Sequence, residues 1–377
     1  MSKIIVLGCG MVGSAIALDL SKKHTVSVAD FSENSLQKIQ EKNKGIRTFQ
    51  LDVTNIPELK KAIQDFDLVM CAVPGFLGFQ TLKSCIEAKK NVVDISFFPE
   101  NALELHQLAM DNEVTTIVDC GVAPGMDNFI LGYENEKYEL SHFECLVGGL
   151  PKVKKWPFAY KAPFSPIDVI EEYTRPARYV ENGQLIIKDA LSDIEHVEFD
   201  GVGTLESFNS DGLRSIIYTM SHIPNMKEKT LRYPGHAKYI NVLKSSGFFD
   251  TQKINYQGIR ISPIEFTSKI LFNEWKLNED EEEMTIMRIT LQGKDKQGNK
   301  KTIVYNLHDK YCGESKTASM SRTTGYTACA AVHLLLEGWF DKKGVYPPEL
   351  VGKSEKCFQY VLNYLSERGV YYHRHES

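Results

Sequence analysis

The 377-residue sequence contains no apolar run long enough to span a bilayer, and it opens directly into a strand-like segment with no signal peptide before it. The sequence also has no excess of basic residues over acidic ones. The net charge is −5, and the acids and bases are interspersed, which argues against a nucleic-acid partner. Internal repeats and low-complexity segments are absent as well. We therefore expect a cytoplasmic globular protein that binds neither nucleic acid nor a membrane.

The 8 cysteines form no C-x-x-C pair, and several lie in apolar runs, so we expect reduced thiols in the core. The sequence also lacks a Ser/His/Asp order, a His/Cys set at metal-ligand spacing and a G-x-x-x-x-G-K-S/T loop. We therefore expect no metal. With 42% hydrophobic and 25% charged residues, the chain has the composition of a globular protein and enough length for two domains.

The first thirty residues carry the clearest signal. A β-branched segment at residues 3–7 leads into Gly8-x-Gly10-x-x-Gly13, then into a small-residue helix and a second strand that ends on Asp30. In this context Gly8 allows the tight turn, Gly10 lets the backbone approach a pyrophosphate, and Gly13 lets the helix pack on the strand. Asp30 can accept hydrogen bonds from both hydroxyls of an adenosine ribose. This pattern is typical of a dinucleotide-binding fold.

The charge after the second strand favours one cofactor over another. Residues 31–34 contain no arginine or lysine to meet a 2′-phosphate, and Asp30 would repel one. We therefore expect NAD, with NADP less favoured. FAD uses a similar fingerprint, but nothing later in the sequence suggests a site for its isoalloxazine ring.

Strands and helices continue to alternate up to residue 119, which predicts right-handed crossovers and a doubly wound parallel sheet. Expected strands cover residues 46–51, 67–72, 91–95 and 114–119, and expected helices cover 32–42, 79–89 and 99–112. Asp52 and Val53 either bracket the adenine or cap the next helix. The residues that we expect to contact the cofactor are Gly8, Gly10, Met11, Val12, Gly13, Asp30, Ser32, Asp52, Val53, Ala72, Val73, Pro74 and Ser96.

The alternation of strands and helices ends near residue 122. We divide the chain into three parts. We expect an α/β Rossmann domain over 1–122, a second α+β domain with a mixed or antiparallel sheet over 123–315, and C-terminal helices over 316–377 that return to the Rossmann domain. The second part shows a strand at 142–150, short strands within 175–208, helices at 213–220, 237–245 and 264–277, and a hairpin of 283–292 with 301–308. The last part shows a helix at 323–338, a turn at 344–349, a helix at 354–367 and a polar tail.

The second domain must supply the substrate pocket, since a nicotinamide cofactor performs the hydride chemistry itself. Arg175 and Arg232 are candidates for a substrate carboxylate, or else form surface ion pairs. Asp211 is a candidate for an ammonium group, or else caps a helix before Leu213. The remaining candidates are Tyr160 and Lys161 for proton transfer, or packing at a domain edge, and His236 as a substrate-binding residue or the start of a helix.

At these positions the chain resembles the saccharopine dehydrogenase family, and within it the lysine 6-dehydrogenase branch. The motifs that carry the resemblance are the fingerprint with Asp30, VPG at 73–75, CGVAPGM at 120–126, GGLP at 148–151, YKAPFSP at 160–166, EEYTRPA at 171–177, DGLR at 211–214 and TLRYPGH at 230–236. The resemblance implies a Rossmann domain followed by an amino-acid-binding domain. The glutamate-forming members carry a substrate-contacting acid just before the Pro-Gly that matches residues 124 and 125. Ala123 occupies that position here, which disfavours saccharopine as the substrate.

The resemblance implies an NAD-dependent oxidation at the ε-carbon of L-lysine, which gives 2-aminoadipate 6-semialdehyde. Within the same class, the alternatives are C–N oxidation of saccharopine and of a carboxyalkyl polyamine such as carboxynorspermidine. In another class, the chain is a non-catalytic NAD-binding protein that senses redox state. We expect a small amino-acid ligand and a homodimer.

Overall fold

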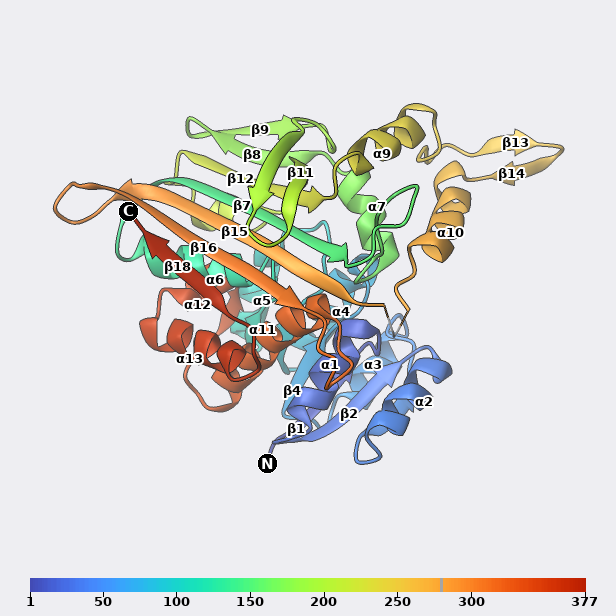
Figure 1. Cartoon of the computed structure of the whole chain (residues 1–377). Coiled ribbons are helices and arrows are strands. Elements are labelled where there is room, and N and C mark those ends of the chain that lie inside the picture. The colour runs from blue at the N-terminus through green and yellow to red at the C-terminus, as the bar shows by residue number, and fades with distance from the viewer. Residues whose placement is uncertain (279–280) are drawn as a thin grey trace.

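The computed structural model describes residues 1–278 and 281–377, apart from the side chains of residues 166 and 167. Two large sheets organise the chain, one formed mainly by the N-terminal third and one by the middle of the sequence (Figure 1). The α/β fold class with a second, mixed-sheet domain is confirmed. The domain limits that we expected from the sequence stay a prediction.

The first sheet has seven parallel strands in the order β17-β6-β5-β4-β1-β2-β3. Its strands are β1 (Lys3–Leu7), β2 (Thr25–Asp30), β3 (Arg47–Gln50), β4 (Leu68–Cys71), β5 (Asn91–Asp94), β6 (Thr115–Ile117) and β17 (Gly344–Tyr346). The order reverses direction beside β1, where β2 lies on one side and β4 on the other. Open α/β sheets bind their ligands at such a switch point. Our expectation of a turn at 344–349 is wrong, because the start of this segment pairs with β6 as an edge strand.

Helices cover both faces of this sheet, and side-chain caps explain where α2 and α3 begin. They are α1 (Met11–Leu20), α2 (Glu33–Lys42), α3 (Ile56–Ala62), α4 (Gly75–Glu87), η1 (Ala102–Leu105) and α5 (His106–Asp111). The hydroxyl of Ser32 accepts a hydrogen bond from the Ser35 N–H and starts α2, as we predicted. Asn55 caps α3, so the helix-cap alternative for Asp52 is wrong. Helix α4 begins four residues before the predicted start, since Pro74 at its N-cap initiates it.

The second sheet has nine strands, with β10-β11-β12-β7-β15-β16-β18 in line, β8 paired with β12, and β9 paired with β8. Its strands are β7 (Glu139–Pro151), β8 (Ala177–Glu181), β9 (Gln184–Lys188), β10 (Glu195–Phe199), β11 (Gly203–Asn209), β12 (Asn225–Arg232), β15 (Glu283–Lys294), β16 (Lys300–Lys310) and β18 (Tyr372–Glu376). We did not predict β12, which pairs in parallel with β7. The expected polar tail is wrong, because residues 372–376 pair with β16 as β18.

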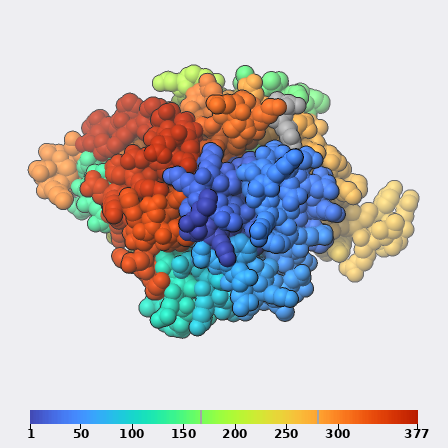
Figure 2. All heavy atoms as spheres, turned by 90° about the horizontal axis from the view of Figure 1, so that it is seen from below, coloured from blue at the N-terminus to red at the C-terminus, as the bar shows by residue number. Residues whose placement is uncertain are grey.

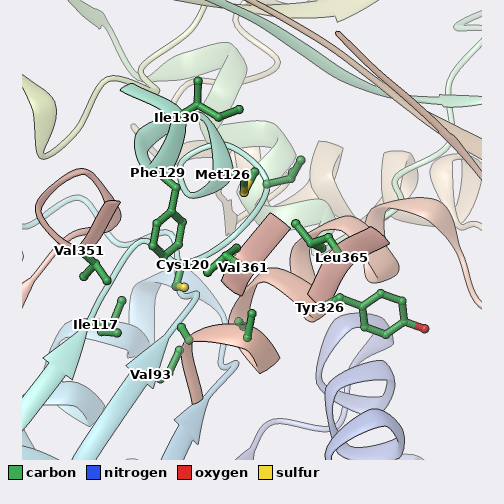
Figure 3. Close-up of a cluster of buried hydrophobic side chains, with 14 of the residues drawn as sticks. Val93, Ile117, Cys120, Met126, Phe129, Ile130, Tyr326, Val351, Val361 and Leu365 are labelled. Carbon is green, nitrogen blue, oxygen red and sulfur yellow. The ribbon is translucent and has the colours of Figure 1, made fainter. Parts of the chain in front are cut away.

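Helices α6 (Met126–Asn135), α11 (Ser319–Leu336), α12 (Pro348–Gly352) and α13 (Glu355–Ser366) join the two sheets. One contiguous buried cluster runs from the first sheet through these helices to the second sheet. Figure 3 shows its centre, where Val93 and Ile117 of the first sheet lie near Phe129 of α6 and Val361 of α13. Seen from below, the C-terminal helical part of the chain lies directly beside the N-terminal residues (Figure 2), and Arg368 pairs with Asp19 of α1 at 2.8 Å.

The remaining elements lie around the second sheet. They are α7 (Pro166–Thr174), α8 (Ile216–Thr219), α9 (His236–Ser245), α10 (Pro263–Trp275) and the two-stranded arm of β13 (Ile254–Tyr256) and β14 (Ile259–Ile261), which projects from the body in Figure 1. The helix expected at 213–220 is reduced to α8. None of the helices in the described part of the chain combines the length and apolar character that crossing a bilayer requires.

Candidate functional site

A cavity of about 500 Å³ takes its lining from both sheets. The first sheet contributes the carboxyl ends of β1, β2, β4 and β5, the second sheet contributes β7 and β12, and helix α7 adds further residues. Most of the residues that we predicted to contact a cofactor line it: Gly8, Gly10, Met11, Val12, Gly13, Asp30, Ala72, Val73, Pro74 and Ser96. Ser32, Asp52 and Val53 lie outside it. Ser32 caps α2, and the carboxylate of Asp52 accepts hydrogen bonds from Thr54.

The glycine turn after β1 fits a dinucleotide. Gly8 has a φ of +101°, and a Cβ there would lie 2.3 Å from the Ala72 carbonyl oxygen. A Cβ on Gly13 would lie 2.1 Å from the Gly8 oxygen, whereas a Cβ on Gly10 would meet no atom within 4 Å. Gly8 and Gly13 therefore permit close packing, and Gly10 faces open space. Because no side chain caps α1, its first N–H groups are free to bind a pyrophosphate.

The Asp30 carboxylate is held rigidly at the end of β2. Its Oδ2 accepts a hydrogen bond from the Cys9 N–H at 2.6 Å, and its Oδ1 accepts one from the Ser32 N–H at 2.7 Å. Each oxygen keeps a lone pair that can accept a ribose hydroxyl. These two backbone contacts hold the carboxylate in one orientation at the lining of the cavity.

Arg232 is buried at the end of β12 and lines the cavity, so the surface-ion-pair alternative is wrong for this residue. Its Nη2 donates to Glu172 at 2.8 Å and its Nε donates to the Tyr173 hydroxyl at 3.2 Å. The guanidinium also lies 4.4 Å from the centroid of the Tyr160 ring. These contacts hold the guanidinium fork in one orientation.

Arg175 also lines the cavity, at the C-terminal end of α7. It pairs with Glu171 and lies 5.0 Å from the centroid of the Phe97 ring. Its Nη1 is buried and has no hydrogen-bond partner among the described residues. This free donor makes Arg175 a second possible partner for a substrate carboxylate.

The other candidate residues are less available than we expected. Asp211 does not cap a helix, because its two oxygens pair with Arg178 at 2.9 Å each. His236 begins α9 and lies behind Arg232, with its Nε2 2.9 Å from the Tyr173 hydroxyl. Burial lowers the pKa of His236 to about 3, so the ring is neutral. Tyr160 packs under Arg232, and Lys161 donates to the Glu274 carbonyl oxygen at 2.7 Å outside the cavity.

Several acids that we did not predict also line the cavity. They are Asp119, Asp168, Glu171, Glu172 and Glu228. Asp119 forms a buried ion pair with Arg214, in which the Arg214 Nε lies 2.7 Å from the Asp119 Oδ1. Glu228 lies on β12, and its Oε2 has no hydrogen-bond partner within the described part of the chain. Sequence reasoning missed Glu228 because it stands between two lysines, a pattern that reads as a solvent-exposed segment.

Comparison with known proteins gives two family matches. The model for the saccharopine dehydrogenase NADP binding domain matches residues 4–117, and the model for the saccharopine dehydrogenase C-terminal domain matches residues 121–370. Carboxyaminopropylagmatine dehydrogenase from Synechocystis sp. is 22% identical, over 93% of this chain and 92% of that protein. Mitochondrial alpha-aminoadipic semialdehyde synthase from Mus musculus is 25% identical, over 92% of this chain and 45% of that protein. The chain thus spans less than half the length of the mouse synthase.

Two solved structures share the fold along the whole chain. Apo saccharopine dehydrogenase (L-Glu forming) from Saccharomyces cerevisiae superposes with a TM-score of 0.80 at 18% identity, and the match covers 100% of both chains. The homospermidine synthase from Legionella pneumophila, in complex with NAD, gives a TM-score of 0.68 at 13% identity over 100% of this chain and 91% of that chain. At these identities the likeness is one of fold.

Proposed function

This chain belongs to the saccharopine dehydrogenase family, and from that premise we propose that it is an NAD-dependent dehydrogenase that oxidises the ε-amine of L-lysine. The observation that carries the proposal is the charge of the cavity. Its lining holds two arginines, Arg175 and Arg232, which pair with Glu171 and Glu172, and it also holds the further acids Asp168 and Glu228. Such a lining suits a substrate with one carboxylate and two amino groups.

The same charge balance disfavours saccharopine, because that molecule carries three carboxylates. Ala123 supports this preference, since it lines the cavity without adding a polar group. A carboxyalkyl polyamine has one carboxylate and several amines, so it is the second candidate. The similarity to the Synechocystis enzyme, which extends over 92% of that protein, favours this candidate specifically.

NAD is the proposed cofactor because of the fixed carboxylate of Asp30. The name of the matched domain refers to NADP, but a 2′-phosphate would have to approach an acid held by two backbone hydrogen bonds. The negative charges of the 2′-phosphate and of the Asp30 carboxylate would repel each other. The fingerprint glycines and the uncapped end of α1 would hold the pyrophosphate.

The chemistry follows from how the cavity positions a substrate. When bound, the nicotinamide ring supplies the hydride acceptor. Arg232 would hold the α-carboxylate of lysine, so the aliphatic chain extends toward the glycine turn. The cavity wall also includes the apolar side chains of Val122, Val147 and Phe164, which reduce access of water. Loss of hydride from the ε-carbon and of a proton from nitrogen leaves an imine, and water converts this imine to the aldehyde and ammonia.

The test is NADH formation by the purified protein with L-lysine, saccharopine and N-carboxyalkyl polyamines, each with NAD and with NADP. We expect the largest kcat/KM for L-lysine with NAD. A larger value for saccharopine would contradict the argument from cavity charge. Tight NAD binding without turnover of any of these substrates would favour the redox-sensing alternative.

A further inference from the structure

Glu228 is placed as a ligand-binding group rather than as a packing residue. Its side chain lies on β12, only 5% of the residue is exposed, and it lines the cavity. A Cβ on Gly212 would lie 1.8 Å from Glu228 Oε1 and 2.2 Å from Oε2, so the absence of a side chain at position 212 makes room for the carboxyl group. A buried carboxylate oxygen without a partner is costly, and such an oxygen calls for a ligand.

Asp127 and Cys145 lie directly behind Glu228. A carboxylate oxygen of Asp127, the Sγ of Cys145 and a carboxylate oxygen of Glu228 all lie within 4.8 Å of one another. Asp127 is in the first turn of α6, where its Oδ1 accepts a hydrogen bond from the Gly125 N–H at 2.8 Å. Its Oδ2 has no partner among the described residues. Two buried carboxyl groups therefore face each other at the wall of the cavity.

The surroundings of this pair are mostly anionic or neutral. The titratable and charged groups that face it are Cys145, Glu172, Tyr179, Asp211, Arg214, Glu349 and Tyr372. Arg214 is the one cation in that set and is paired with Asp119, while Glu172 pairs with Arg232 and Asp211 pairs with Arg178. The charge that remains unpaired there, among the described residues, is that of Glu228, Asp127 and Glu349. A substrate carboxylate would be repelled from this end of the cavity, whereas an ammonium group would be attracted.

We propose that Glu228 binds the reacting amino group of the substrate and accepts the proton that this amine must lose before hydride transfer. The proposal rests on the proposed function. In the step, an N–H bond of R–CH₂–NH₃⁺ breaks and an O–H bond forms on Glu228. The nitrogen lone pair then forms the C=N bond as the C–H bond breaks and hydride passes to NAD⁺, which is reduced to NADH. Asp127 is a positioning residue that acts through Glu228.

The burial of the two acids supports a role in proton transfer. Burial, and then the neighbouring Glu349, raise the pKa of Asp127 to about 7. Burial and the charge of Asp127 raise the pKa of Glu228 well above its usual value. A carboxylate whose pKa is raised by burial is a better proton acceptor than an ordinary glutamate.

The first experiment measures amine binding by calorimetry, with 1,5-diaminopentane as the probe and with the protein saturated with NADH. Because burial and the neighbouring acid favour the protonated form of the pair, we expect binding of the cation to release up to one proton at pH 7. Buffers of different ionisation enthalpy report the number released. Binding by the wild-type protein without proton release at pH 7 would overturn the proposal, and this measurement needs no variant.

The second experiment compares Glu228→Gln with the matched control Glu144→Gln. Glu144 lies on the neighbouring strand β7, where it pairs with Lys227 at 2.8 Å at the partly exposed surface. We expect Glu228→Gln to weaken diamine binding at least tenfold, to abolish proton release and to lower kcat/KM for L-lysine at least a hundredfold, with NAD affinity kept. We expect no change for Glu144→Gln. Diamine binding by Glu228→Gln that matches the wild type would overturn the proposal.

A third variant, Asp127→Asn, tests the positioning role. Removing the neighbouring negative charge lowers the pKa of Glu228, so the acid limb of the kcat/KM profile should move to lower pH. A purely structural role would lower activity at every pH without moving the limb, and would overturn the assignment of Asp127. A tightly bound metal ion whose removal abolishes diamine binding would overturn the proposal as a whole. Proton-linked diamine binding in a protein that fails to oxidise lysine would support it and refute only the proposed substrate.

Discussion

Replacing Arg232 with alanine would remove the group that we propose to fix the substrate carboxylate. A charge-assisted hydrogen bond contributes about 1.5–3 kcal/mol, so kcat/KM for L-lysine should fall roughly ten- to a hundredfold. The Arg232→Lys variant keeps the charge but loses the planar fork that Glu172 and Tyr173 hold in place, so its kcat/KM should be intermediate. NAD affinity, measured by calorimetry, should stay at the wild-type value because Asp30 and the glycine turn belong to the first sheet, whereas Arg232 belongs to the second.

The same substitution also affects folding, and the two effects can be separated. Breaking a buried ion pair costs about 3–5 kcal/mol, and Glu172 would lose the partner that lies 2.8 Å away. Its side chain is 20% exposed, so we expect the lower end of that range. In the double variant Arg232→Ala/Glu172→Gln the unpaired charge is gone, so the free energy of unfolding should recover while kcat/KM does not.

Arg374→Ala is the matched control for these measurements. Arg374 pairs at 2.8 Å with Glu134, whose side chain is fully buried, and it lies on β18 outside the cavity. This control should lose stability in urea denaturation and keep wild-type kinetics with lysine. If Arg232→Ala and Arg232→Lys both keep wild-type kinetics with every substrate tested, Arg232 is a structural residue and the site assignment is refuted.

Further predictions concern the cofactor, pH and assembly. Asp30→Ala should narrow the preference for NAD over NADP in kcat/KM, and a tenfold preference of the wild-type protein for NADP would show that our interpretation of Asp30 is wrong. Gly10→Val should abolish NAD binding in calorimetry and leave the melting temperature nearly unchanged, since a Cβ there meets no atom within 4 Å; unchanged NAD affinity would refute the fingerprint assignment. His236 has its pKa lowered to about 3, so its contribution to stability is present above its unfolded pKa of about 6.5 and is lost as pH falls toward 3; His236→Gln should flatten the stability profile across that window in denaturant titrations. We also expect a homodimer, which light scattering would detect, and a monomer at micromolar concentration would contradict this expectation.

Local patterns in the sequence predicted the nucleotide-binding half of the site. The roles of Gly8, Gly10 and Gly13 depend on one turn between a strand and the next helix, and the role of Asp30 depends on the end of one strand. Such geometry is set by neighbouring residues, so the alternation of strands and helices identifies the doubly wound sheet. The cap formed by Ser32 was predictable for the same reason, since its partner is three residues away.

Long-range pairing decided the substrate half. Asp211 pairs with Arg178, which lies thirty-three positions away in the sequence. The sequence pattern alone does not predict this contact. We missed strand β12 because its charged residues are not typical of a buried strand. Its pairing with β7 is what brings Glu228 near Cys145. Residues 344–346 and 372–376 become strands because distant partners, β6 and β16, offer unpaired edges. The sequence by itself thus determined the cofactor fold and the residues of its turn, whereas tertiary contacts decided which acids and arginines share the cavity, because charge and burial depend on partners far apart in the chain.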